Sequence, residues 1–289
     1  MTGSANKSTN RLRQLLPVFS ILTVVVVWEL LSIIVGTSET GGQRSNEPYK
    51  IVPGIEDVFG AFITFAGYWK GGLGAESTKV GADATYWGAF LGLGYNTGVS
   101  VLRVIVGYLL GVTAGLFLAL AVSWSQIIRD LISFPAHFAR MLPLIAMLPI
   151  FALWFGNSEL GTFMFVGFAV GIVIFVIAIN AIGNVPNYYA DYAYSLGANR
   201  MRTYLTVIFP AAMPQIRSGI LLGVAFSWSA VLAAEIIGKQ FGLGHILSFS
   251  LYYAATKTIA LTGLVTIAIS AGTYLAASKV LAWVTRWAE

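Results

Sequence analysis

Three charged residues lie within strongly apolar stretches of the sequence, namely Glu29, Arg103 and Glu235. An ionised side chain near the middle of a bilayer costs about 2.5 to 3.5 kcal/mol on insertion scales, so such a residue needs a partner or a functional cavity. One arrangement pairs Arg103 with Glu235 or Glu29 and ties the outer ends of their helices together. In the other, Arg103 lies beside a translocation pathway and attracts an anionic solute. We favour the structural ion pair, and the second arrangement stays open.

Prolines interrupt one of the apolar stretches, between residues 132 and 155. Pro143 and Pro149 lie well inside it, and each removes a backbone donor and clashes with the preceding helical turn. A broken helix is therefore expected here, with its freed backbone groups facing protein or a water-filled path. We assign Pro143, Met147 and Pro149 to the border of such a path.

Catalytic chemistry is not indicated by the sequence. It contains no cysteine, which excludes a thiol nucleophile, and only two histidines, too few for a catalytic metal cluster. A Gly-x4-Gly-Lys-Ser/Thr phosphate loop is also missing, so the chain should not hydrolyse ATP itself. No nucleophile has a matched base, and no carboxylates cluster. We predict no catalytic residue, no metal site and no cofactor bound by this chain.

A polar interruption about thirty residues long separates two apolar segments and is expected to form two short helices at an angle. Asn184 can cap the first helix, and Gly197 can end it in a left-handed conformation. Asn199 can cap the second, which Pro210 and Pro214 are expected to stop or kink. A polar loop with ordinary caps would use the same residue types, so this stretch alone does not establish a function.

Helical spacing gives the first of these short helices two faces. The residues expected to rest on the protein's own helices are Tyr189, Ala193 and Leu196. The residues on the opposite face, which can meet a partner, are Tyr188, Asp191 and Ser195.

The composition is that of a multi-pass membrane protein. The 289 residues are 57% hydrophobic and 10% charged, whereas about a quarter of the residues of a soluble domain are charged. We expect an all-α fold of about six transmembrane helices. The predicted spans are residues 15–36, 98–122, 132–155, 161–182, 216–238 and 259–284.

Glycines recur at every fourth residue in two of these spans. Gly107, Gly111 and Gly115 lie in the second span, and Gly219 and Gly223 lie in the fifth. A ribbon of small residues on one helix face lets another helix approach closely. We expect helix packing at both ribbons, although glycines can also be merely tolerated in lipid.

The distribution of basic residues predicts the orientation. Lysines and arginines are more frequent on the side of the termini, which places both termini and the polar stretch in the cytoplasm. Arg129 and Asp130 are expected to mark a short cytoplasmic turn. The expected organisation is a cytoplasmic tail at 1–14, a first helix at 15–36, an external loop with an interfacial helix at 37–96, and a core of five transmembrane helices at 97–285 that contains the polar stretch 183–214.

Part of the polar stretch resembles the EAA motif of the membrane subunits of ATP-binding cassette (ABC) importers. That motif reads Glu-Ala-Ala, three residues, Gly, nine residues, Ile-x-Leu-Pro. The residues at the matching spacing are Asp191, Ala193, Gly197, Val207, Phe209 and Pro210. The sequence departs from the motif by Asp for Glu, Tyr192 for the first Ala of the pair, Val for Ile and Phe for Leu.

A second resemblance lies in the proline-rich span. The run from Pro143 to Pro149, which continues to Leu-Trp-Phe-Gly156, resembles the Pro-Pro-Leu-Ala-Trp-x-Pro and Trp-Phe-Gly pattern of the nitrate, sulfonate and taurine branch of ABC permeases. The segment 227–238 with Glu235, followed by Gly-Leu-Gly244, resembles the same branch. Both patterns agree in order and distance, so the chain resembles a permease with the type I (MetI-like) importer fold.

The resemblance implies a function and partners. The implied partners are a second copy of the permease in a homodimer, two ATPase subunits that carry ATP and Mg, a solute-binding protein and the lipid of a bacterial inner membrane. No nucleic acid is implied. The solute would be a small anion such as nitrate, a sulfonate, taurine or an organic carboxylate. The polar stretch would be the coupling helix that sits in a groove of the ATPase. The residues assigned to ATPase coupling are Asp191, Tyr192, Ala193, Ser195, Leu196, Gly197, Ala198 and Pro210.

Two alternatives remain open. Proline-broken helices and intramembrane charges also serve self-sufficient channels and secondary carriers, which would transport without ATP. A multispan membrane enzyme is disfavoured because no catalytic constellation is visible.

Overall fold

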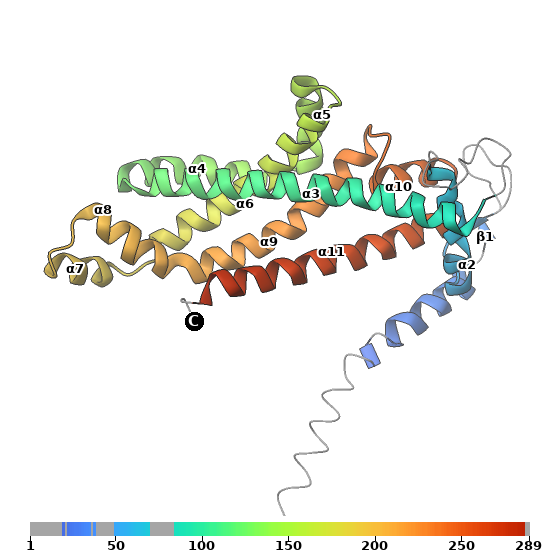
Figure 1. Cartoon of the computed structure of the whole chain (residues 1–289), viewed down its shortest axis with the longest axis horizontal. Helices are drawn as coiled ribbons and strands as arrows, with labels where there is room; N and C mark the ends of the chain where they lie inside the picture. Colours follow the sequence, from blue (N-terminus) through green and yellow to red (C-terminus); the bar gives the residue numbers. More distant parts are fainter. Residues whose placement is uncertain (1–18, 21, 36, 39–48, 70–83, 287–289) are drawn as a thin grey trace, which may run out of the picture. The chain divides into compact units, whose positions relative to one another are not determined.

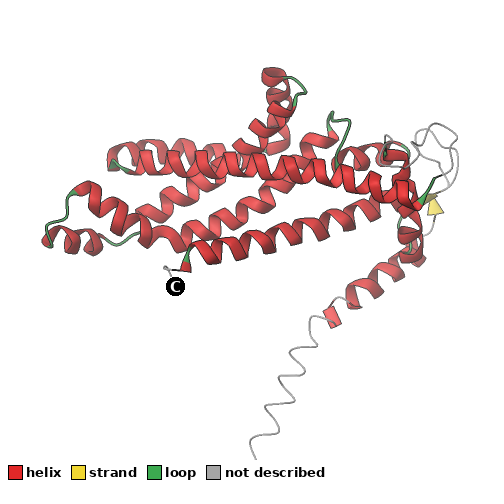
Figure 2. Ribbon diagram, in the orientation of Figure 1, coloured by secondary structure: helices red, strands yellow, loops and turns green. Residues whose placement is uncertain are grey.

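The computed structural model describes residues 19–20, 22–35, 37–38, 49–69 and 84–286, and these are helical almost throughout (Figures 1 and 2). The chain divides into two compact units, one formed by Met1–Leu93 with Leu247–Gly263 and the other by Gly94–Ile246 with Leu264–Glu289. The predicted all-α fold is confirmed, apart from a pair of two-residue strands.

The first unit begins with the helix Leu22–Val35 and two antiparallel strands, β1 (Thr37–Ser38) and β2 (Tyr49–Lys50). Helix α2 (Ile55–Gly60) and the 3-10 helix η1 (Ala61–Tyr68) follow. Glu29 accepts a hydrogen bond from the backbone nitrogen of Ile55 at 3.1 Å. The carboxylate thus sits at the start of α2, where a negative charge meets the positive end of the helix dipole.

The second unit contains most of the long helices. In chain order, the remaining elements are α3 (Tyr86–Ser123), α4 (Gln126–Met141), α5 (Leu144–Phe155), α6 (Glu159–Gly183), α7 (Asn187–Ser195), α8 (Arg200–Thr203), the π-helical turn η2 (Tyr204–Ile208), α9 (Phe209–Ile236), α10 (Leu243–Tyr252) and α11 (Thr256–Val284). Both α3 and α11 extend into the first unit as well.

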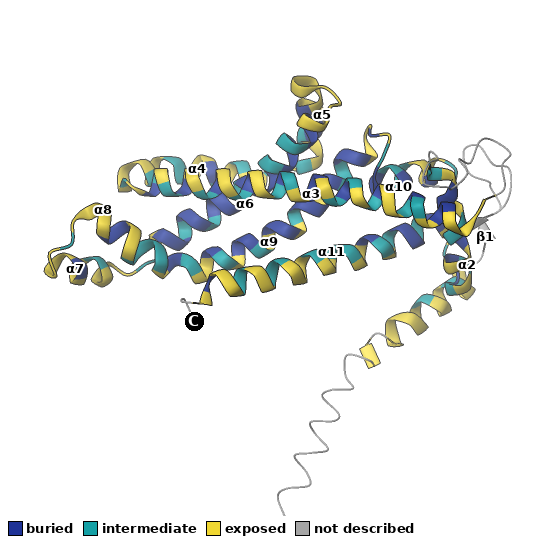
Figure 3. Cartoon of the chain, in the orientation of Figure 1, coloured by how far each residue is buried: buried dark blue, intermediate teal, exposed yellow. Residues whose placement is uncertain are grey.

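Helix α6 is the centre of the second unit. It packs mainly against α9, and also against α4 and α5. Most of its residues are apolar and buried, and Figure 3 shows buried residues along α6 and α9. The helix begins at Ser158, whose side chain caps it by accepting a hydrogen bond from the Gly161 nitrogen at 3.1 Å.

Four helical segments of the described residues are long and apolar enough to cross a membrane, namely α3, α6, α11 and the continuous segment Arg200–Ile236. A fifth span is formed if α4 and α5, which are bent by 97° at their junction, are counted together. The helix Leu22–Val35 is shorter, and residues 15–18, 21 and 36 of the predicted first span lie outside the described part of the chain. About six spans remain consistent with this count.

Two predicted boundaries were wrong. Residues 86–96, expected in the external loop, form the start of α3, because Thr85 caps that helix by accepting a hydrogen bond from the Gly88 nitrogen at 3.0 Å. Arg129 and Asp130 lie inside α4 rather than in a turn. The chain turns earlier, where Ser125 has an extended backbone and α4 begins.

Candidate functional site

The polar stretch forms a helix with a defined C-terminal cap. Gly197 follows α7 with a φ of +83°, the left-handed region that favours glycine. The Gly197 nitrogen donates to the Tyr194 oxygen at 2.9 Å, and the Ala198 nitrogen donates to the Ala193 oxygen at 3.1 Å. These two bonds form a Schellman motif, which satisfies two of the last carbonyls of α7. The spacing of the EAA motif at this end of α7 is therefore the spacing of a helix cap.

The solvent-facing side of α7 is mostly aromatic. Tyr192 and Leu196 are 70% and 73% exposed, and Tyr188 lies one turn earlier on the same face. Only Ala193 is buried in this helix. The prediction that Leu196 rests on the protein's own helices was wrong, because the chain turns away at Gly197 and carries the leucine outward.

The cap expected at the start of α7 was also wrong. Asn184 is the C-terminal cap residue of α6, and the N-cap of α7 is Pro186, which makes no side-chain cap hydrogen bond. Asp191 lies mid-helix rather than in the first turn. Its charge is therefore too far from the helix start to benefit from the positive end of the helix dipole.

Of the two outcomes expected for the prolines after α7, a stop or a kink, the stop is wrong. Asn199 caps α8 by accepting a hydrogen bond from the Arg202 nitrogen at 2.8 Å, and the helical path then continues to Ile236. The π-helical turn η2 precedes Pro210, which lies in the first turn of α9 where a missing N–H is tolerated. Pro214 lies inside α9. From Arg200 on, the polar stretch is thus helically continuous with a membrane-spanning segment that ends at Ile236.

The end of α3 holds this continuous helix in place. Arg200 donates from Nη2 to the Trp124 oxygen at 2.7 Å, and its guanidinium lies 5.3 Å from the centre of the Trp124 ring. The Tyr204 hydroxyl donates to the Leu120 oxygen at 3.0 Å. A movement of α7 and α8 would therefore be transmitted to α3 as well as to α9.

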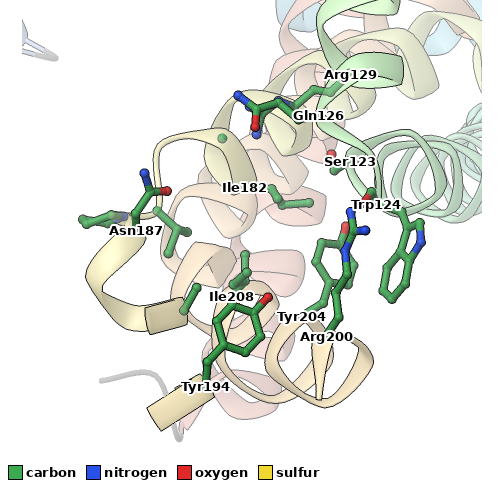
Figure 4. A pocket seen from close by; sticks show the side chains of 14 residues that line it. Ser123, Trp124, Gln126, Arg129, Ile182, Asn187, Tyr194, Arg200, Tyr204 and Ile208 are labelled. Carbon is green, nitrogen blue, oxygen red and sulfur yellow. Dashed lines mark hydrogen bonds between the residues drawn. The ribbon is translucent and has the colours of Figure 1, made fainter. Parts of the chain in front are cut away.

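A cavity of about 250 Å³ lies between these elements. Figure 4 shows its walls, with Arg129 and Gln126 at the top of the view, Asn187 at the left, Arg200 toward the bottom and Tyr194 lowest. The lining side chains are largely polar. They come from the ends of α3 and α6 and from α4, α7, α8 and η2.

A second polar site lies at the opposite end of α6. Arg103 donates from Nε and Nη2 to the two carboxylate oxygens of Glu159, at 2.8 and 2.6 Å. Its Nη1 donates to Glu235 at 2.8 Å and to the Phe241 oxygen at 2.7 Å. Arg103 therefore holds two carboxylates, and one of them belongs to a residue that we did not single out from the sequence.

Glu235 is fully buried and has several hydrogen-bond donors. Besides Arg103, Ser100 Oγ donates to it at 2.8 Å and the Gly244 nitrogen donates at 2.8 Å. A side chain at Gly242, where φ is +113°, would collide with the Glu235 carboxylate. The residues of the Glu…Gly-Leu-Gly pattern therefore lie together: the turn at the start of α10 packs against the Glu235 carboxylate and donates a hydrogen bond to it.

Lys239 joins the loop before α6 to the same site. Its Nζ donates to the Ser158 oxygen at 2.7 Å and lies 3.7 Å from Glu159. Burial lowers the pKa of Lys239, and the Glu159 carboxylate opposes that shift. The Asn157 side chain also donates to the Gly238 oxygen. Glu159 lies at a helix start and Lys239 just after a predicted span, and neither was singled out from the sequence.

The predicted glycine ribbons all face α6. A Cβ at Gly107 would lie 2.5 Å from Val166, and one at Gly111 would lie 2.6 Å from Val170. One at Gly115 would lie 2.6 Å from the Gly171 oxygen. In α9, a Cβ at Gly219 would lie 2.7 Å from Ile177, and one at Gly223 would lie 3.2 Å from Val170. Helices α3 and α9 therefore approach α6 at distances that only glycine permits at most of these positions.

The predicted break of the proline-rich span lies between α4 and α5. Leu142 has an extended backbone before Pro143, as the residue before a proline prefers, and Pro143 is the N-cap of α5. Pro149 lies inside α5 and is exposed, whereas Met147 is half-buried. Of the prolines in this span, Pro143 alone marks the break.

Comparison with protein families gives a match over most of this unit. The model of the family described as the binding-protein-dependent transport system inner membrane component matches residues 111–288.

Individual relatives were also found. The chain is 29% identical over 189 residues to the taurine transport system permease protein TauC of Escherichia coli strain K12, which covers 65% of this chain and 66% of that protein. It is 32% identical over 159 residues to the nitrate import permease protein NrtB of Leptolyngbya laminosa, which covers 54% of this chain and 56% of that protein. The chain thus matches between about half and two thirds of the length of these relatives.

A solved structure shares the fold. The chain resembles the MetNI methionine ABC transporter in an inward-facing conformation, with a TM-score of 0.50 and 15% identity, over 66% of this chain and 92% of that chain.

Proposed function

Because the chain belongs to the family of inner membrane components of binding-protein-dependent transport systems, we propose that it is the permease subunit of an ATP-driven importer. It would form the pathway for a solute delivered by a solute-binding protein, and separate ATPase subunits would bind ATP and Mg. The resemblance to ABC permeases of the nitrate, sulfonate and taurine branch is confirmed by the family match and the relatives.

The observation that carries the proposal is the construction of α7. Its exposed face presents Tyr188, Tyr192 and Leu196, large side chains that a partner can bury. Behind that face, the capped turn at Gly197 leads into a helical path that continues to Ile236. A partner that binds the exposed face of α7 could therefore move the membrane span that begins after this turn.

The solute is proposed to be a small anion. Relatives of the chain are named as taurine and nitrate permeases, and both solutes carry a negatively charged oxyanion group. Arg103 is assigned to structure rather than to the solute, because two carboxylates and a carbonyl occupy its donors. Pro143, Met147 and Pro149 are proposed to border the pathway, at and beyond the bend between α4 and α5.

A second copy of the chain is proposed as a partner. Helix α4 exposes a stripe of large apolar side chains at alternating spacings of four and three residues, while Ala136 on another face is buried. The stripe consists of Ile127, Leu131, Phe134, Phe138 and Met141. Such a seam suits packing against another helix, although lipid can also cover it.

The location is proposed to be a bacterial inner membrane, with both termini and α7 in the cytoplasm. The excess of basic residues on that side of the predicted spans supports this orientation.

The proposal is tested by gentle extraction of the tagged chain from its native membrane, followed by mass spectrometry of what copurifies. We expect a phosphate-loop ATPase, and a mass for the intact complex that corresponds to two copies of each subunit. The purified complex should take up solute in proteoliposomes only with ATP. Recovery of the chain alone, with transport that needs no ATP, would instead favour a secondary carrier.

A further inference from the structure

The cavity beneath α7 has the charge of an anion site. Among the described residues that line it, Arg129 and Arg200 carry charge and none is acidic. Its volume of about 250 Å³ exceeds the ~30 Å³ that one water molecule takes in the liquid. There is therefore room for a small oxyanion together with some water.

The two arginines retain donors for such a ligand. Arg200 uses Nη2 for the Trp124 oxygen, and a guanidinium has five N–H groups. Arg129 is about three-quarters buried, and its nearest carboxylate is that of Asp130, at 3.6 Å from Nε. That distance is too long for a strong hydrogen bond, and the Asp130 side chain is mostly exposed.

The start of α7 adds backbone donors to the same cavity. Pro186 and Asn187 line it, and no side chain caps this nine-residue helix. The first N–H groups of an α-helix have no partner within the helix and carry partial positive charge. An anion at the uncapped end of α7 would satisfy them.

A buried hydroxyl is a further, independent observation. Ser123 lines the cavity and is only 9% exposed; its Oγ lies near the Tyr204 hydroxyl but makes no hydrogen bond of good geometry among the described residues. A buried polar group without a good partner is unfavourable, so such a position usually holds water or a ligand.

From these four features we propose that the cavity binds a phosphate-like oxyanion between α3, α4, α7 and α8. Arg129, the Ser123 hydroxyl and the start of α7 would hold it. The oxyanion is either free in the cytoplasm or the phosphate of an anionic lipid headgroup, since both present the same oxygens. Binding of the oxyanion would fix α7 against α3 and α4 and would thereby regulate the movement of α7. The site goes beyond the proposed transport function, and its existence does not depend on the identity of the transported solute.

The test measures binding to the full chain without any partner. Radiolabelled inorganic phosphate is titrated into the chain in detergent, and native mass spectrometry of nanodiscs containing phosphatidylglycerol or only phosphatidylcholine tests the lipid source. The variants are Arg129→Gln and, in case that change destabilises the fold, Gln126→Glu, which adds a repelling charge to the cavity wall. Arg140→Gln is the matched control, because Arg140 is an exposed residue of the same helix that does not line the cavity.

We expect saturable binding of phosphate, or retention of phosphatidylglycerol but not phosphatidylcholine. Both variants should weaken that binding at least tenfold, while Arg140→Gln should leave it unchanged. The proposal is overturned if neither ligand binds, or if Arg140→Gln weakens binding as much as Arg129→Gln does. Because the assay requires neither ATP nor uptake, its failure would leave the proposed transport function standing.

Discussion

At the scale of single residues, the geometry explains why particular side chains stand where they do. Glu235 is buried where the turn before α10 supplies the Gly244 N–H, and Ser100 and Arg103 supply the other donors. Gly242 has to lack a side chain because the carboxylate occupies that space. A buried carboxylate is stable only when its oxygens are paired in this way.

Arg103→Gln is predicted to prevent assembly of the complex. Removal of one partner of a buried ion pair costs about 3 to 5 kcal/mol, and here it would leave Glu235 unpaired. Thermal unfolding of the purified protein and gel filtration of the complex measure the effect. Arg140→Gln, the same change at an exposed site, should alter neither. An intact complex with weakened uptake would instead assign Arg103 to the solute, and an intact complex with normal uptake would exclude both roles.

Gly197→Ala is predicted to leave the chain in the membrane but to uncouple ATP hydrolysis from uptake. A left-handed conformation costs an L-residue about 1 to 2 kcal/mol, so the cap of α7 would rearrange. Space is not the reason, because no atom lies within 4 Å of a Cβ built at this glycine.

The control for this prediction is Gly272→Ala, which also places its Cβ in open space, but inside α11. The ratio of solute transported to ATP hydrolysed in proteoliposomes should fall for Gly197→Ala alone. An unchanged ratio would show that the cap geometry is not needed for coupling.

The sequence was informative about some residues and silent about others. The cost of an intramembrane charge was enough to suggest that Arg103 needs a carboxylate, and Glu235 was one of the two named. Glu159 and Lys239 could not be recognised, because each lies at the end of an apolar stretch where a charge is inexpensive. Leu196 was placed on the wrong face because periodicity applies only as far as the helix, which stops at Ser195.

At the scale of elements, α6 is the common surface of the second unit, with α3 on one side and α9 on another. The apolar length of each core span predicted its helix to within a few residues, apart from the starts of α3, of α4 and of the segment that contains α9. The sequence could not show that α9 begins without a break, since a π-helical turn before Pro210 depends on the packing around it. A break in this span was similarly expected from its prolines, but only the structure distinguishes Pro143, at the 97° bend, from Pro149 inside α5.

Gly111→Val is predicted to destabilise the contact between α3 and α6. The new side chain would collide with Val170 and the Gly167 oxygen, and overpacking of this kind costs about 1 to 3 kcal/mol. The melting temperature of the protein in detergent should fall. Gly98→Val on the same helix, where a Cβ has open space, serves as the control. Equal melting temperatures for the two variants would argue against close packing at this ribbon.

At the scale of the whole molecule, α7 is the place where we propose that an ATPase subunit binds. The exposed face of this helix has no role in the chain's own fold, because its large side chains contact mainly solvent. A change on that face should therefore separate partner binding from stability. Changes near α6 would not distinguish partner binding from stability, because the residues there are needed for both.

The most direct measurement is the affinity of the purified chain for its ATPase subunit when Tyr192 is replaced by Arg. We expect a loss of affinity of at least about tenfold, as for a large side chain central to an interface, with an unchanged melting temperature. Tyr86→Arg is the matched control, because Tyr86 is 73% exposed and Tyr192 is 70% exposed. Tyr86→Arg should bind the ATPase normally. Normal binding by Tyr192→Arg would contradict the proposed role of α7, since the ATPase would then have to bind the permease elsewhere.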